Sequence, residues 1–302
     1  MLIGGSTLKL LTDAPAIAGQ TMIVAGGLTA LVAALALRRA GPGSRFVTGA
    51  ILLLGIALHL GGIGFYTAMH GTGGLVISLL SLYAAGLIGL AGWFIDLRLV
   101  TALAIVPFAQ ALDTSTEYFH AAYVFYSPEP TLSILQMALL MGLCYWLTHR
   151  FAARTARHGG ILAVMAFIVA NLCALVGSLW GDAVGSTLWA PSITGSTSSN
   201  AYDAAMNASN NSALTISADL YAVLWAVALA AMVLWAGANN RRGLFNTALT
   251  FAAIHAYTQV FETFYAEPLA YVIGGLAAIP LAWGMWRLNT WFLAKGRGLS
   301  PV

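Results

Sequence analysis

Hydrogen-bonding side chains lie near the centres of several long apolar stretches. His59, Asn171 and His255 are each near the middle of such a stretch, and Gln110 takes a comparable, slightly outer place in another. Charged groups cost about 2.5–3.5 kcal/mol at a bilayer centre, so polar residues there indicate function. Histidine suits a proton relay because its ordinary pKa lies near working pH. The four residues predict a polar path through the membrane; hydrogen bonding between helices is the alternative.

Carboxylates form a second group, because nine of the ten lie toward one end of the apolar stretches and only Asp96 lies toward the other. Asp113, Glu117 and His120 follow i, i+4, i+7 spacing, which on a helix puts them on one face. Together with Glu129 they predict an outer funnel that attracts cations or protons by focusing the electric field. A solvated rim of carboxylates is the alternative interpretation.

Glu262 lies about two helical turns beyond His255, and the two residues share one face of their stretch because they are seven apart. We expect Glu262 and His255 to carry or relay protons. The path would be lined by the other mid-stretch residues, His59, Gln110 and Asn171.

Metal and haem sites are weaker alternatives. Glu117 and His120 have the Glu-x-x-His spacing of di-iron bundles, but such sites need two of these pairs. His59 and His255 could in principle be axial haem ligands. No cofactor is predicted, and an enzyme is not favoured. The sequence has no GxxxxGK[ST] phosphate loop and no HExxH zinc motif, and its two lysines lie near the ends, which excludes a retinal protein.

The composition indicates the elements that position these residues. Of the 302 residues, 60% are hydrophobic and 8% are charged, and the mean hydropathy is +0.83. A soluble domain carries about 25% charged residues, so a soluble fold is excluded. Apart from Lys9, the basic residues lie in short clusters at the ends of apolar runs, so nucleic acid is not expected as a partner. The predicted partners are the lipid bilayer and a small ion or solute.

A helix needs about 20 apolar residues to cross the membrane. Nine stretches qualify and predict an all-α polytopic bundle of about nine transmembrane helices, read as one span plus four helical hairpins in a single domain, 1–302. The stretches are Ile17–Leu37, Val47–Met69, Leu75–Phe94, Leu99–Tyr118, Leu132–Thr148, Ile161–Trp180, Ser217–Gly237, Leu244–Tyr265 and Leu269–Leu293.

Basic clusters follow the first, third, fifth, seventh and ninth stretches, and the other connections have no Lys or Arg. The positive-inside rule makes the basic side cytoplasmic. This predicts an outer N-terminus, with a short outer segment at 1–16, and a cytoplasmic C-terminus. It also places the long connection 181–215 outside, where it could dock a protein partner.

The stretch from Asn246 to Asn289 combines Tyr257-Thr258, Phe261-Glu262, Gly274-Gly275-Leu276 and a closing Trp286-Arg287. It resembles the tail of an uncharacterised class of bacterial multi-pass membrane proteins, a domain of unknown function, over under a fifth of the chain. The resemblance implies a bacterial inner (plasma) membrane protein and carries no activity.

Three functions follow from these features. The leading prediction is a small multi-pass transporter or proton/cation-linked permeation protein with an outer acidic vestibule and a mid-membrane His/Asn/Gln layer. The first alternative is a non-catalytic subunit or assembly component of a larger complex, docked through residues 181–215. The second alternative is a haem- or metal-binding membrane redox enzyme.

Overall fold

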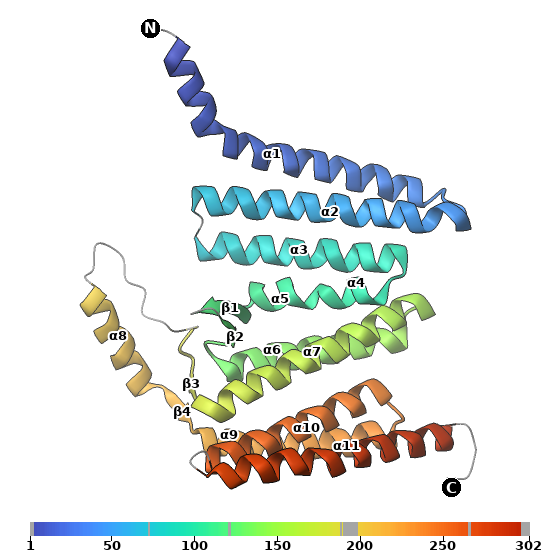
Figure 1. Ribbon diagram of the computed structural model, residues 1–302, viewed down its shortest axis with the longest axis vertical. Helices are drawn as coiled ribbons and strands as arrows, with labels where there is room; N and C mark the ends of the chain where they lie inside the picture. Colours follow the sequence, from blue (N-terminus) through green and yellow to red (C-terminus); the bar gives the residue numbers. More distant parts are fainter. Residues whose placement is uncertain are drawn as a thin grey trace. The chain divides into compact units, whose positions relative to one another are not determined.

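The chain is almost entirely helical in a computed structural model (Figure 1). It packs as two compact units. Unit 1 comprises Met1–Asp113 with Leu147–Leu162, and unit 2 comprises Thr114–Trp146 with Ala163–Val302. The structure describes residues 3–71, 73–119, 122–187, 189, 199–264 and 267–296.

Unit 1 is a row of helices that lie next to one another in chain order (Figure 1). They are α1 (Ile3–Leu37), α2 (Pro42–His70), α3 (Gly74–Ile95), α4 (Arg98–Leu103) and α5 (Ile105–Ala111).

Glycines allow α1 and α2 to touch backbone to backbone. A Cβ on Gly26 would lie 2.4 Å from the backbone nitrogen of His59, and a Cβ on Gly55 would lie 2.6 Å from the backbone nitrogen of Ala30. Small residues at such crossings are typical of membrane helix pairs, which gain their stability from close packing. The buried side chains of this unit include Ala33, Leu37, Leu52, Ile56 and Ala91. His59 is therefore held at the tightest part of the α1–α2 contact.

Unit 2 contains the remaining elements, except that residues 147–150 of α6 and 153–162 of α7 belong to unit 1. The helices are α6 (Pro130–Arg150), α7 (Ala153–Trp180), α8 (Ser199–Ser212), α9 (Ala218–Ala238), α10 (Arg242–Thr263) and α11 (Pro268–Gly296). Two short antiparallel pairs complete it, β1 (Ser115–Phe119) with β2 (Ala122–Tyr126) and β3 (Asp182–Val184) with β4 (Leu214–Ile216). The main buried cluster comprises Ala174, Trp225, Leu229, Ala248 and Phe251.

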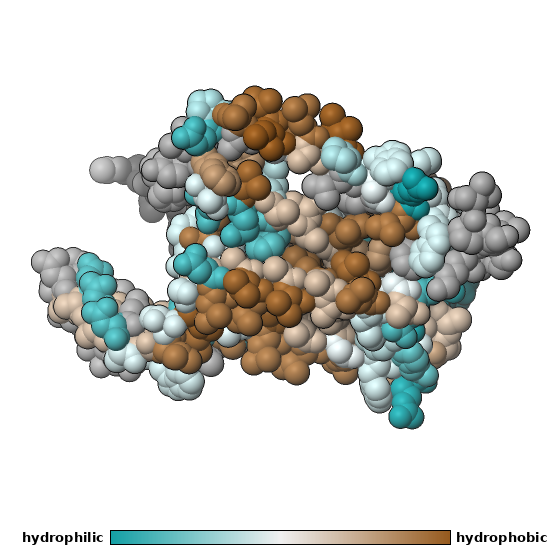
Figure 2. All heavy atoms as spheres, turned by 90° about the horizontal axis from the view of Figure 1, so that it is seen from below, coloured by the Kyte–Doolittle hydropathy of each residue, from teal (hydrophilic) through white to brown (hydrophobic). Residues whose placement is uncertain are grey.

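Six helices among the described residues are long and apolar enough to cross a membrane, and they match six predicted spans. They are Pro15–Leu37, Gly43–His70, Gly74–Ile95, Pro130–Arg150, Ala153–Trp180 and Ala218–Ala238. Much of their surface is exposed and apolar, and Figure 2 shows broad hydrophobic areas with hydrophilic residues gathered into smaller patches. Such surface needs a hydrocarbon environment. The chain is therefore a multi-pass α-helical membrane protein, and the predicted fold class is confirmed.

The fourth predicted span, Leu99–Tyr118, is wrong as one continuous helix. The chain forms the short helices α4 and α5, which meet at Ala104, and then the strand β1. Pro107 explains the break, because it has no N–H for the carbonyl of Leu103 and its ring crowds that carbonyl. Asp113 adopts a left-handed φ of 58°, which ends helical geometry, and the following residues are rich in strand-forming aromatic and β-branched types.

The last two predicted spans form long helices, but these are not among the six helices whose length and mean hydropathy suit a membrane span. The 22-residue helix α10 carries several polar side chains that lower its mean hydropathy. The apolar part of the 29-residue helix α11 covers Val272–Leu288. The connection 181–215 also differs from an irregular loop, since it contains β3, α8 and most of β4, with residues 188 and 190–198 outside the described part.

Candidate functional site

Two of the predicted mid-membrane residues meet in unit 2 through a residue that the sequence analysis did not single out. Asn171 on α7 is buried, and its Oδ1 accepts a hydrogen bond from the indole Nε1 of Trp225 on α9 at 2.9 Å. The Trp225 ring meets the His255 ring of α10 edge to face, with centroids 4.7 Å apart. We call Asn171, Trp225 and His255 the Asn171 cluster. Trp225 escaped notice because tryptophan in an apolar helix ordinarily indicates packing.

Two polar side-chain atoms on α10, one of them in this cluster, have no partner among the described residues. Among the described residues, Nδ1 of His255 and Nε2 of Gln259 are buried and have no hydrogen bond. The two residues are four apart on α10, so they lie one turn apart on the same face. Most buried polar atoms in proteins are paired with protein or with water. The place is therefore a candidate binding position for water or a polar ligand.

His59 is used differently, in unit 1. Its Nδ1 lies 2.8 Å from the Ile23 carbonyl of α1, and its Nε2 lies 2.8 Å from the Tyr83 hydroxyl of α3. The ring borders a cavity of about 320 Å³ that is lined mainly by apolar side chains of α1, α2 and α3. Because both ring nitrogens already have partners, His59 in this arrangement joins three helices.

Gln110 and Glu262 are exposed. Gln110 lies in the last turn of α5 in unit 1, and Glu262 lies in the last turn of α10 in unit 2. Within the described parts of the chain neither side chain has a hydrogen bond or ion pair. The structure thus brings together Asn171 and His255 in unit 2, where Glu262 lies about two turns further along α10, whereas Gln110 and His59 belong to unit 1.

The predicted shared face of Asp113, Glu117 and His120 is wrong. Asp113 follows the end of α5, and Glu117 lies on β1 opposite Val124, so the helical spacing does not apply. His120 lies outside the described residues.

Glu129 is buried rather than part of a solvated rim, with 3% of its surface exposed. Its carboxylate accepts hydrogen bonds from the backbone N–H groups of Gly185 at 2.6 Å and Thr187 at 3.1 Å, and from the Thr187 hydroxyl. Its position between two prolines at the start of α6 directs it into the protein. The hydrogen bonds of Glu129 therefore connect the segment after β3 to the start of α6.

A cavity of about 700 Å³ adjoins this region of unit 2 and contains a carboxylate that the site prediction left out. Asp182 is 9% exposed, and its Oδ2 accepts a hydrogen bond from the backbone N–H of Thr131 at 2.8 Å. We call this space the Asp182 cavity. Its walls include Phe125, Tyr126, Trp180, Asp182, Ser186 and Ser217.

The Asp182 cavity and the Asn171 cluster are close neighbours along α7 and α9. Thr131, whose backbone N–H donates to Asp182, also has its hydroxyl 2.6 Å from the hydroxyl of Tyr221. Tyr221 is one turn before Trp225 on α9. On α7, Val176 lines the cavity and is five residues from Asn171, or about 7.5 Å along the helix. A Cβ on Gly177 would lie 2.5 Å from the Tyr221 ring, so the two helices are in close contact here. The Asp182 cavity thus lies within about two helical turns of the Asn171 cluster on both helices.

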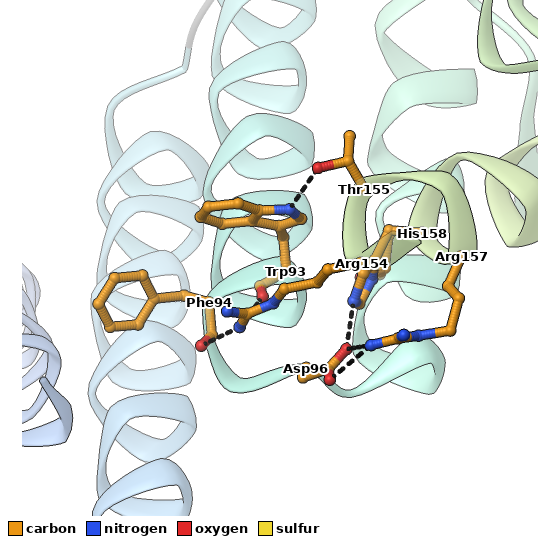
Figure 3. A network of polar contacts seen from close by, with 8 residues as sticks. Trp93, Phe94, Asp96, Arg154, Thr155, Arg157 and His158 are labelled. Carbon is orange, nitrogen blue, oxygen red and sulfur yellow. Dashed lines mark hydrogen bonds and ion pairs between the residues drawn. The ribbon is translucent and has the colours of Figure 1, made fainter. Parts of the chain in front are cut away.

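Unit 1 has its own polar network at the end of α3 (Figure 3). Asp96 accepts from Arg157 at 2.8 Å and lies 3.0 Å from Nε2 of His158, whose Nδ1 lies 2.7 Å from the Thr101 hydroxyl. The hydrogen bonds with His158 and Arg157 hold the pKa of Asp96 below its ordinary value. Arg154 donates to the carbonyls of Trp93 and Phe94, which completes the end of α3.

The order Thr101–His158–Asp96 resembles a nucleophile, a base and an orienting acid. However, Thr101 is 2% exposed, and a Cβ on the adjacent Gly92 would lie 2.4 Å from its hydroxyl oxygen. No substrate could reach that hydroxyl. The network therefore joins the end of α3 to the start of α7. The basic cluster after the fifth stretch was the signal that could have indicated it.

No group of three or more His, Cys, Asp or Glu side chains is placed to hold a metal ion within the described residues. Of the weak metal candidates, Glu117 lies on β1 and His120 lies outside the described residues. The Glu117 side chain, like His120, is outside what the structure describes, and the haem candidates His59 and His255 belong to different units.

These features define the class of protein, a multi-pass helical membrane protein with a polar cluster inside one unit. Comparison with protein-family models, with curated proteins and with solved structures found no match for this chain.

Proposed function

We propose that the chain is a membrane transport protein that passes a small cation or a proton-coupled solute through unit 2. The Asp182 cavity is the entrance, and the Asn171 cluster with Gln259 is the central site. The observation that carries the proposal is the pair of buried, unpartnered atoms, Nδ1 of His255 and Nε2 of Gln259. A transported ion, solute or water would satisfy them in passing.

The charges around the entrance support a cationic solute. Asp182 and Glu129 are both buried, and neither has a basic partner among the described residues. Buried carboxylates without a basic partner attract cations, and low-dielectric walls strengthen that attraction. The proposal does not include Glu262, because its side chain is exposed at the end of α10.

In this scheme the chain's own groups have separate roles. Trp225 donates a hydrogen bond to Asn171, and its ring packs edge to face with the His255 imidazole. The other side of His255 is left to Gln259 and the solute. Histidine can gain and release a proton near neutral pH, so His255 couples solute movement to protons.

Proton flux into proteoliposomes tests the proposal without knowledge of the solute. A potassium diffusion potential would drive uptake, and a pH-sensitive dye inside the vesicles would report it. We expect flux above that of protein-free vesicles, reduced about tenfold or more in His255→Ala and in Asp182→Asn. Glu262→Gln and Asp203→Asn, which alter exposed carboxylates, are the matched controls and should leave flux unchanged.

The transport proposal is overturned by two results. One is flux no greater than in protein-free vesicles for protons, sodium, potassium and small organic cations alike. The other is undiminished flux in His255→Ala that is monodisperse in detergent and reconstitutes as well as wild type.

An assembly subunit is the second candidate, and the polar contacts of unit 1 favour it. His59 and Asp96 are both fully engaged in joining helices, as a purely structural role requires. This candidate expects a stable complex with other membrane proteins after extraction in mild detergent. A chain that runs alone, or only with copies of itself, in native mass spectrometry of such an extract contradicts it.

We propose the bacterial inner membrane as the location, with the N-terminus outside and the C-terminus in the cytoplasm, on the basis of the basic clusters and the C-terminal resemblance. Green fluorescent protein fused after Val302 should fluoresce, since it folds in the cytoplasm. Alkaline phosphatase fused at the same position should be inactive. The reverse pair of results contradicts this orientation.

A further inference from the structure

We propose that the Asp182 cavity binds an organic ammonium ion, with the charged nitrogen near Asp182 and the apolar substituents against the aromatic walls. The inference rests on the proposed function and deepens it, because it names the class of solute.

The walls combine the two chemistries that recognise such an ion. The lining residues include Trp180, Asp182 and the adjacent β2 residues Phe125 and Tyr126, of which the alternation along a strand lets one ring face the cavity. A cation over an aromatic face is attracted by the electron-rich ring, and quaternary ammonium groups are recognised in this way. No Lys or Arg is among the described residues that line the cavity, so nothing there repels a cation.

The charge of Asp182 is only partly balanced by the protein. The carboxylate accepts one hydrogen bond from Thr131 at the start of α6, where the helix end carries a partial positive charge. That interaction is smaller than a full ion pair. The second buried carboxylate, Glu129, lies beside the same segment and adds negative potential. A bound cation completes the charge balance.

The same walls do not suit a metal ion. Calcium takes six to eight oxygen ligands at about 2.3–2.6 Å, and magnesium takes a compact octahedron. One carboxylate with scattered hydroxyls cannot supply such a set, and the described residues contain no group of three metal-ligating side chains. The volume of about 700 Å³ instead fits a molecule of several carbon atoms.

Exposed aromatic rings also occur where a membrane helix meets water, and Trp180 is 72% exposed. Trp189 provides a matched control, because it is 73% exposed and is not one of the residues that line the cavity. If the rings served only as interface anchors, substitutions of Trp180 and Trp189 would have the same effect.

Calorimetric titration of the full chain in detergent tests the inference with two probes of the same shape. Acetylcholine carries a quaternary ammonium, and 3,3-dimethylbutyl acetate replaces the nitrogen by carbon. We expect acetylcholine to bind about tenfold or more tightly than the neutral ester. Asp182→Asn, which keeps an oxygen for Thr131, and Trp180→Leu should each weaken acetylcholine binding by about tenfold. Asp203→Asn and Trp189→Leu should not change it.

Equal binding of the two probes, no binding of acetylcholine, or equal effects of Trp180→Leu and Trp189→Leu would overturn the inference. If Asp182→Asn did not fold, the two probes and the two tryptophan variants would still decide. The titration involves no flux, so its outcome is separate from that of transport. Acetylcholine binding without flux would retain this site and overturn transport, whereas flux without binding would do the reverse.

Discussion

The indole N–H of Trp225 donates to Oδ1 of Asn171 at 2.9 Å and joins α9 to α7 near the middle of both helices. Asn171→Leu would leave that buried donor unpaired, and we expect a loss of about 1–3 kcal/mol in the free energy of unfolding. Trp225→Phe removes the donor itself. In that background Asn171→Leu should therefore lower the free energy of unfolding by less than it does in the wild type. Denaturant unfolding of the four proteins in detergent measures the coupling; additive losses would contradict it.

Asp96 makes the stability of unit 1 dependent on pH. Because its folded pKa is lowered by His158 and Arg157, the stabilisation is complete above the ordinary value of 3.8 and is lost as the pH falls through the lowered value. We expect the thermal midpoint of the wild type to drop more than that of Asp96→Asn between about pH 5 and about pH 2. The difference should shrink in high salt, since the carboxylate is partly exposed. An equal change of the thermal midpoint with pH in the wild type and in Asp96→Asn would contradict this prediction.

Gly26 keeps α1 and α2 in backbone contact. A Cβ there would lie 2.4 Å from the backbone nitrogen of His59, so Gly26→Ala must separate the helices. We expect it to lower the free energy of unfolding by about 1–3 kcal/mol. Gly64→Ala on α2 is the control, because a Cβ at Gly64 meets nothing within 4 Å and should be neutral or slightly stabilising. Thermal unfolding in detergent compares the two, and equal midpoints would refute the close contact.

Glu129 fastens the segment after β3 through the N–H groups of Gly185 and Thr187. In Glu129→Ala these amides lose a charged acceptor, and we expect their hydrogen exchange to speed up by about tenfold or more. Exchange mass spectrometry of the peptide spanning them provides the measurement. Glu267→Ala, at an exposed carboxylate, should leave exchange in this peptide unchanged, and an effect of equal size in both variants would count against the contact.

The sequence was sufficient for the fold class because long apolar runs leave little choice in a membrane. It was insufficient at 99–118, where the helical spacing of Asp113 and Glu117 assumed a helix, whereas α5 ends at Ala111 and Glu117 lies on β1. It indicated that Asn171 and His255 matter but not that Trp225 links them, because helix pairing cannot be derived from spacing within one helix. Asp182 was counted only as an outer charge, since its burial depends on the contact with Thr131, 51 residues away.

The contact between Asp96 and Arg157 also imposes an order on biosynthesis. The two residues are 61 positions apart, and Arg154 completes the end of α3 from a similar distance. A ribosome adds about 5–20 residues per second, so Arg157 is added at least about 3 s after Asp96. Until Arg154 has been added, the carbonyls of Trp93 and Phe94 lack that donor. The first hairpin, α1 with α2, needs no such wait and can pack while the rest of unit 1 is still being made.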